Sequence, residues 1–113
     1  MAGETGREAS GRAAEAVAQV VYTQNALTNL ERAFNFMVEH DSHAALASAA
    51  AIREAVETLS NHPLIGRRVE GNVRELVISY GKTGYVALYR FLPQQNLIRI
   101  LAIRHQRELD YLA

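Results

Sequence analysis

The sequence predicts an α+β fold in which two antiparallel helices pack on one face of a mainly antiparallel four-stranded sheet, in the order β-α-α-β-β-β. Three observations support this prediction. Apolar residues recur at helical spacing between Leu27 and Leu59, apolar segments rich in Val, Ile, Leu and Tyr fill most of residues 73–105, and turn-forming residues separate those segments. Both helices need one face of the sheet to bury their apolar stripes.

The chain begins with a segment, residues 1–15, that we expect to be a flexible leader, because its three glycines break any helix. A single domain then spans residues 16–113. Its first element is predicted to be a strand, since residues 16–23 are short of polar side chains and rich in β-branched ones. We expect this strand to pair at the side of the later strands.

Two helices are predicted next. Thr23 or Asn25 can cap the first helix, and Asp41 or Ser42 the second, by accepting hydrogen bonds from first-turn amides. The second helix ends before Pro63. The apolar stripe of the first comprises Leu27, Leu30, Phe34, Met37 and Val38, and that of the second Leu46, Ala49, Ile52, Val56 and Leu59. We expect Leu46, Ile52, Val56 and Leu59 of the second stripe to be buried against the sheet.

Three strands complete the domain. They are predicted at residues 73–80, 84–92 and 96–105, where Val, Ile, Leu and Tyr dominate. Gly-Lys-Thr-Gly separates the first two and Pro-Gln-Gln-Asn the last two, and both strings are typical of hairpin turns. The three strands therefore form an antiparallel meander.

Composition limits the classes of function. The 113 residues suffice for one domain, and a hydrophobic content of 49% is that of a folded chain. The absence of cysteine excludes a disulfide, a thiolate nucleophile and a cysteine-ligated metal. No apolar run reaches the roughly 18 residues of a membrane-spanning helix, and the leader does not resemble a signal peptide, so we expect a cytoplasmic protein.

Charge is unevenly distributed although the net charge is zero. Residues 1–60 carry four basic residues against eight acidic ones, for −4, and residues 61–113 carry eight basic against four acidic, for +4. A basic half attracts phosphates, whereas ordinary solvated surface explains the same numbers equally well. The candidates for phosphate contacts are Arg67, Arg68 and Lys82.

The residue types present allow few kinds of catalytic site. The histidines lack carboxylates at metal-ligand spacing, so we expect no metal site and no cofactor. Metal-free cleavage of RNA requires a base, an acid, and a cation that stabilises the phosphorane. His105 fits the first or second role, and Arg74, Arg90 or Arg104 the third.

A structural role for two of these arginines is also open. Strand alternation places Arg74 on the face of Ile78, and Arg90 on the face of Leu88. An arginine that shares a face with such residues lies at the edge of a core, either as a salt-bridging residue or as part of a functional groove.

Five strings in order resemble the RelE/ParE toxin family, over about residues 17–111. They are VVYTQNALTNLERAFNFM, which resembles the family's first strand and helix, NHPLIGR at 61–67, REL at 74–76, YVALYR at 85–90 and IRHQR at 103–107. The resemblance implies the toxin of a type II toxin–antitoxin (plasmid stabilisation) system that a cognate antitoxin neutralises. In this family RelE-like toxins cleave messenger RNA on the ribosome, and ParE-like toxins block DNA gyrase.

The sequence departs from the ribonuclease branch at three positions. By alignment with that branch, Val86 and Leu76 stand where it has cations, and Gln106 where it has a catalytic histidine, one residue from His105. A one-residue offset on a strand points a side chain to the opposite face. The resemblance therefore favours the ParE-like branch.

Three functions follow from the resemblance and remain open. The first is a gyrase inhibitor whose target-binding residues are Arg104, His105, Arg107 and Tyr111. The second is a messenger RNA endonuclease that uses Arg74, Arg90 and His105. The third is an inactive toxin that acts with its antitoxin in repression of their operon. We also expect an exposed apolar patch, covered by the antitoxin or by a homodimer.

Overall fold

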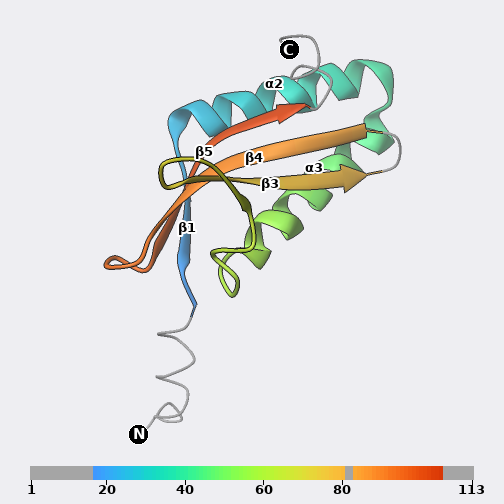
Figure 1. The fold of residues 1–113 in the computed structure, drawn as a ribbon. Coiled ribbons are helices and arrows are strands. Elements are labelled where there is room, and N and C mark those ends of the chain that lie inside the picture. The colour runs from blue at the N-terminus through green and yellow to red at the C-terminus, as the bar shows by residue number, and fades with distance from the viewer. Residues whose placement is uncertain (1–16, 81–82, 106–113) are drawn as a thin grey trace, which may run out of the picture.

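The computed structural model describes residues 17–80 and 83–105 of the chain. The elements are β1 (Gln19–Tyr22), α2 (Gln24–His40), α3 (Ser42–Thr58), β2 (Arg67–Glu70), β3 (Val73–Tyr80), β4 (Thr83–Leu92) and β5 (Leu97–His105) (Figure 1). The predicted leader lies outside the described residues. Within the described ranges, no helix is long and apolar enough to cross a membrane.

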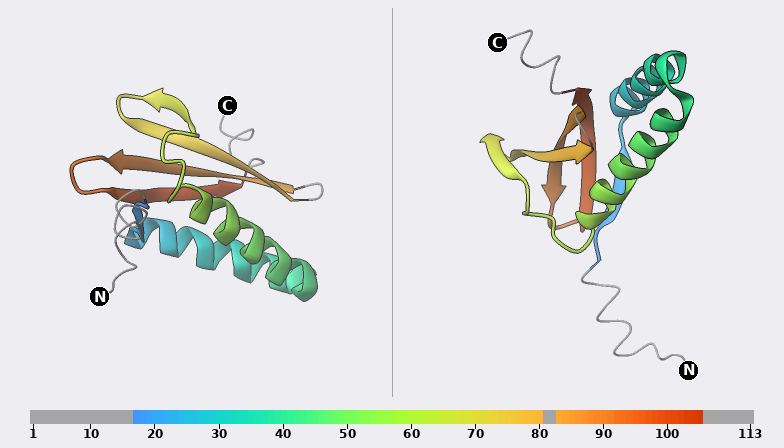
Figure 2. Two further views of the ribbon diagram at one scale, coloured as in Figure 1. Left: turned by 90° about the horizontal axis from the view of Figure 1, so that it is seen from below. Right: turned by 90° about the vertical axis from the view of Figure 1, so that its right-hand side faces the viewer.

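The sheet has the strand order β1-β5-β4-β3-β2. Strand β1 runs parallel to β5, and the other neighbours are antiparallel. Both helices lie on one face of this sheet, and no helix of the described residues lies on the opposite face, which we call the helix-free face (Figure 2). The predicted α+β class, the meander and the side position of the first strand are confirmed.

The prediction of four strands was wrong, because β2 adds a fifth at the edge of the sheet. Strand β2 pairs with β3 through Arg67 opposite Glu75 and Arg68 opposite Arg74. Its sequence, RRVE, has one apolar residue, and all four residues are exposed. A strand with no buried face carries no alternating pattern, so only its backbone pairing reveals it.

The helices begin at two of the predicted caps. The Thr23 hydroxyl accepts a hydrogen bond from the Ala26 amide at 3.1 Å. The Asp41 carboxylate accepts bonds from the amides of His43 and Ala44, both at 3.1 Å. Each cap satisfies amides that the helix itself leaves without a partner.

The apolar stripes are rotated relative to the prediction. In α3, Ile52 and Val56 are buried as expected, but Leu46 is 64% exposed, so the expectation for Leu46 was wrong. The residues of α3 that are buried are Ala45, Ser48, Ile52 and Val56. In α2 only Ala26 is buried. Small side chains toward the core let the helices pack closely there, which turns the larger Leu46 outward.

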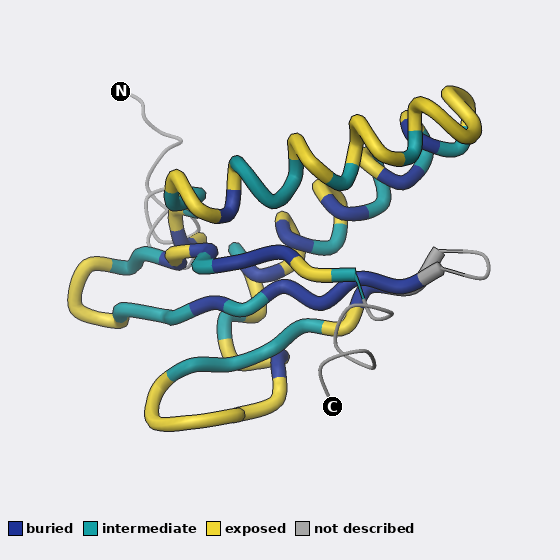
Figure 3. Tube along the Cα trace, turned by 90° about the horizontal axis from the view of Figure 1, so that it is seen from above, coloured by how far each residue is buried: buried dark blue, intermediate teal, exposed yellow. Residues whose placement is uncertain are grey.

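The core lies between the two helices and strands β4 and β5 of the sheet. Tyr85, Ala87 and Tyr89 of β4 are fully or almost fully buried in this core, together with Ile98 and Ile100 of β5. Figure 3 shows the buried residues concentrated in β4 and β5, whereas the loop around β2 is exposed. Alternate residues of β4 therefore point either to the core or to the helix-free face.

A β-bulge in β5 changes which residues share a face. Leu88 pairs with Ala102 but Tyr89 pairs with Ile100, so Leu101 is an extra residue. The Leu101 carbonyl accepts hydrogen bonds from the Thr23 hydroxyl at 3.2 Å and from the Asn25 side chain at 3.0 Å. The start of α2 thus holds the bulge in place.

Candidate functional site

The loop between α3 and β2 is anchored to the sheet by Tyr89. The Tyr89 hydroxyl donates to the Pro63 carbonyl at 2.8 Å and accepts from the Gly66 amide at 2.9 Å. Burial raises the pKa of the Tyr89 phenol, against smaller opposite effects of the Gly66 amide and of Arg74. These two bonds fix the backbone of residues 63–66 against β4.

Gly66 has no room for a side chain. A Cβ atom there would lie 2.6 Å from Tyr89 Cε1, 2.7 Å from the Tyr89 hydroxyl and 2.8 Å from the Glu75 carbonyl oxygen. Two of these three atoms belong to the packed ring that anchors the loop, and the third is backbone. The position therefore requires glycine for close approach.

Arg74, expected as a cation in catalysis or as a structural residue, binds the same loop. Its guanidinium donates to the Gly66 carbonyl at 2.7 Å and to the Leu64 carbonyl at 3.2 Å. It lies on the helix side of the sheet, opposite Tyr89 in the pairing of β3 with β4. The side chain therefore holds the loop through hydrogen bonds from its Nη1 atom.

Two of the three candidate phosphate contacts also have partners within the chain. Arg67 forms an ion pair with Glu75 across β2 and β3. Arg68 donates to the Gly71 carbonyl at 3.1 and 3.3 Å, in the turn that follows β2. Lys82 lies outside the described residues.

At the end of β5, the consecutive candidate residues Arg104 and His105 lie on opposite faces of the sheet. His105 pairs with Tyr85, and the two rings meet edge to face at 5.1 Å between centroids, on the helix side. Arg104 pairs with Val86 and is exposed on the helix-free face. Arg107 and Tyr111, like Gln106, lie outside the described residues.

The three residues of the candidate ribonuclease site are not brought together. Arg90 lies on the helix-free face, whereas Arg74 and His105 lie on the helix side. Arg74 and His105 pair with β4 at Tyr89 and Tyr85, four residues apart, which is about 13 Å along a strand. No acid–base–cation set forms from these side chains.

Arg99 is a further exposed cation, which no pattern in the sequence singled out. It lies directly opposite Arg90 on the helix-free face. Arg99 and Arg104 are five residues apart, so simple alternation predicts opposite faces, and the extra residue Leu101 puts them on the same face. In the described part of the chain, neither side chain has a hydrogen-bond or ion-pair partner.

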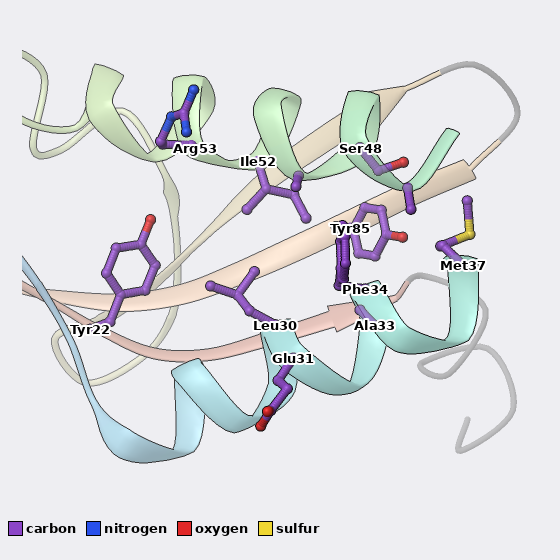
Figure 4. A pocket seen from close by; sticks show the side chains of 12 residues that line it. Tyr22, Leu30, Glu31, Ala33, Phe34, Met37, Ser48, Ile52, Arg53 and Tyr85 are labelled. Atoms are coloured by element: carbon purple, nitrogen blue, oxygen red, sulfur yellow. The ribbon is translucent and has the colours of Figure 1, made fainter. Parts of the chain in front are cut away.

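A second candidate site is an apolar groove of about 440 Å³ between α2 and α3, with Tyr85 at its floor (Figure 4). Its walls include Leu30, Phe34, Met37 and Ile52. Ser48, which is 3% exposed, is one of the residues that line the groove, and its buried hydroxyl has no hydrogen-bond partner among the described residues. A buried hydroxyl without a hydrogen-bond partner costs free energy. A ligand that supplied a hydrogen-bond partner for it would therefore be stabilised there.

The polar end of the groove contains Tyr22 and Arg53. Burial, and then the charge of Glu57, raise the pKa of the Tyr22 phenol, while Arg53 lowers it. Beyond the groove, Val38 is 39% and Leu46 64% exposed. The exposed apolar patch expected from the sequence is therefore present on the helical layer.

Within the described ranges, no group of three or more His, Asp or Glu residues is placed to hold an ion. His40 bonds the Phe36 carbonyl at 2.9 Å on α2, and His43 lies in the first turn of α3.

Comparison with known families identifies the domain. Residues 20–110 match the family described as ParE toxin of type II toxin–antitoxin system, parDE. The chain belongs to this family.

It is also similar to three curated toxins of Caulobacter vibrioides. Toxin RelE3 is 37% identical over 82 residues, covering 73% of this chain and 84% of that toxin. Toxin RelE1 is 32% identical over 73 residues, covering 65% and 78%. Toxin RelE2 is 31% identical over 93 residues, covering 82% and 100%.

Solved structures agree on the fold. A chain of the chromosomal ParDE toxin–antitoxin system from P. aeruginosa has a TM-score of 0.66 at 23% identity, over 80% of this toxin and 97% of that chain. A chain of the RelBE2 toxin–antitoxin complex from Mycobacterium tuberculosis has a TM-score of 0.56 at 22% identity, over 79% and 98%. The family match and the similar curated toxins, together with this fold, place the chain among the type II toxins of the RelE/ParE superfamily.

Proposed function

We propose that this toxin arrests growth in the cytoplasm by binding DNA gyrase rather than by cleaving RNA. The observation that carries the proposal is the separation of Arg74, Arg90 and His105. An arginine cannot take a proton from a 2′-hydroxyl, because its pKa is above about 12. His105 alone supplies only one of the two proton transfers that metal-free cleavage requires.

We assign the contact with the target to the helix-free face, at the C-terminal end of β5. Arg104 is exposed there, whereas His105 is half-buried against Tyr85. Arginines at the centre of protein interfaces often dominate the binding energy. In this proposal Arg107 and Tyr111, which follow in the sequence, extend the same contact.

Adjacent residues on opposite faces give a matched test. In a supercoiling assay with purified gyrase, we expect Arg104→Ala to weaken inhibition about tenfold. We expect His105→Ala, which removes a ring from the other face, to retain inhibition. Circular dichroism melting of both variants controls for folding. Retained inhibition by Arg104→Ala would contradict the assignment of the contact.

A messenger RNA endonuclease is the second candidate, because the three curated relatives carry the name RelE. Primer extension on translated messages after toxin induction separates the two functions. Codon-phased cuts that disappear in His105→Ala or Arg74→Ala would make those residues catalytic and overturn gyrase inhibition. Absence of both activities, with operator DNA bound by the toxin–antitoxin complex, would instead identify an inactive toxin that acts in repression.

The antitoxin is proposed to occupy the groove between α2 and α3 with the apolar face of a helical or extended segment. The groove is apolar, exposed Phe34 lines it, and the buried hydroxyl of Ser48, another lining residue, has no hydrogen-bond partner among the described residues. Segments of this kind bind through apolar side chains placed in pockets and through a few polar contacts. Both structural neighbours come from toxin–antitoxin systems, which is consistent with such a partner.

Two substitutions on α3 test this occupancy. Ala49 is exposed and lines the groove, whereas Glu54 is exposed and does not line it. We expect Ala49→Arg to reduce affinity for the co-expressed antitoxin by at least about tenfold in calorimetry, and Glu54→Arg to have little effect. Equal effects would contradict the proposal, and concentration-dependent light scattering lost only in Ala49→Arg would assign the groove to a homodimer.

A further inference from the structure

The helix-free face of the sheet carries an arrangement of cations that the fold itself does not use. Arg90 and Arg99 lie directly opposite one another on β4 and β5, on the same face. Like charges in this position destabilise a sheet unless an anion lies between them. Neither guanidinium has an acidic partner in the described ranges, and Arg90 Nε is enclosed by protein without a hydrogen-bond acceptor.

Charge is separated between the two layers of the domain. The helical residues 24–58 carry five acidic residues and two arginines, for −3. Residues 67–80 and 83–105 carry six arginines and two glutamates, for +4. Glu75 on the helix-free face is already paired with Arg67. An anionic partner is therefore attracted to the helix-free face and repelled from the helices.

The surroundings of the pair favour a carboxylate-bearing peptide over nucleic acid. Half-buried Leu88 separates Arg90 from Arg104, and Val77, 54% exposed, lies beside them on β3. The aromatic residues of β1 and β4, namely Tyr22, Tyr85, Tyr89 and Phe91, belong to the core on the other face. Among the side chains that the structure describes, this face therefore has no aromatic platform of the kind on which single-stranded nucleic acids stack their bases.

We propose that this face binds an extended acidic segment of the target protein, with two carboxylates four residues apart and an apolar side chain midway. One carboxylate lies between Arg90 and Arg99, the other meets Arg104, and the apolar side chain contacts Leu88. The two cationic contacts lie level with Arg90 and Val86 of β4, which are about 13 Å apart, the length of four residues of an extended chain. Val86 itself is buried, so the second contact is made by exposed Arg104, which lies opposite it on β5. The inference rests on the proposed function in sharing Arg104 as a target contact.

The test uses the full-length toxin and a synthetic heptapeptide with glutamates at its second and sixth positions, leucine at its fourth, and serine or glycine elsewhere. NMR titration at low salt measures binding. We expect a matched peptide with glutamine for glutamate to bind about fivefold more weakly. Arg90→Gln and Arg99→Gln should each weaken binding of the acidic peptide about fivefold, and Arg32→Gln, on exposed α2 surface, should not.

Stability of the free toxin supplies an independent readout. Because Arg99 faces a like charge, Arg99→Gln should raise the melting temperature by about 2 °C without ligand. A lower melting temperature, or equal binding of both peptides, would overturn the inference. Displacement of the peptide by inorganic phosphate or a 12-nucleotide RNA, in an Arg99-dependent manner, would assign the face to phosphates instead. Gyrase is absent from these assays, so their failure is distinguishable from failure of gyrase inhibition.

Discussion

The two faces of β4 show how one strand serves two purposes. On the helix side, Tyr85 and Tyr89 are at most 2% exposed and fixed by packing and by the anchored loop. On the helix-free side, Arg90 carries an unsatisfied guanidinium nitrogen, and its neighbour Arg99 on β5 repels it. The first face contributes stability, and the second retains features that cost stability, as expected of a binding surface.

The largest expected effect tests the packed face at its tightest point. Gly66→Ala should reduce the free energy of unfolding by about 3 kcal/mol, because the new methyl group displaces the Tyr89 ring and its hydrogen bonds. At Gly71, where φ is +57° and no atom lies within 4 Å, alanine should cost only about 1 kcal/mol through backbone conformation. Urea denaturation measures both, and equal losses would refute the packing explanation.

Replacement of a valine by alanine should have different effects on the helix side of the sheet and on its helix-free face. Val56→Ala removes a fully buried side chain of α3 and should cost about 2 kcal/mol. Val77→Ala, on the helix-free face and 54% exposed, should change stability by less than about 0.5 kcal/mol. If thermal unfolding showed Val77→Ala to be as destabilising as Val56→Ala, Val77 would belong to the core and not to a binding surface.

Loss of one hydroxyl should have a smaller effect. Tyr89→Phe leaves the Pro63 carbonyl and the Gly66 amide without their partner and should cost about 1.5 kcal/mol. Tyr22→Phe, at the rim of the groove, is the matched control and should have a clearly smaller effect on the chemical denaturation midpoint. The reverse order would show that the loop is held mainly by Arg74.

The smallest effect is a dependence on alkaline pH. Burial raises the pKa of Tyr89 and of Tyr22 above 10.0, so the folded chain keeps these phenolic protons to a higher pH than the unfolded chain. Their stabilisation is complete below about pH 10 and is lost as pH rises through the folded pKa values. The fall in melting temperature above pH 10 should therefore be shallower in Tyr89→Phe than in the wild type. An unchanged slope would assign alkaline unfolding to other groups.

Most elements could be predicted from local pattern because their apolar residues are periodic. The strand predicted at 73–80 is β3, and those at 84–92 and 96–105 differ from β4 and β5 by one residue at their starts. The caps Thr23 and Asp41 were among the residues expected. Strand β2 could not be found, because an exposed edge strand has no buried face to impose a pattern.

The sequence by itself determined the class of fold, the family, and the composition of the two halves of the chain, since these depend on periodicity and on recognisable strings. Tertiary structure alone decided which faces are exposed. Packing of Ala45 and Ser48 toward the core turned Leu46 outward, and the Leu101 bulge, held by Thr23 and Asn25, brought Arg99 to the face of Arg104. The physical reason is that helix rotation and strand parity depend on contacts between residues far apart in the chain, which local alternation does not encode.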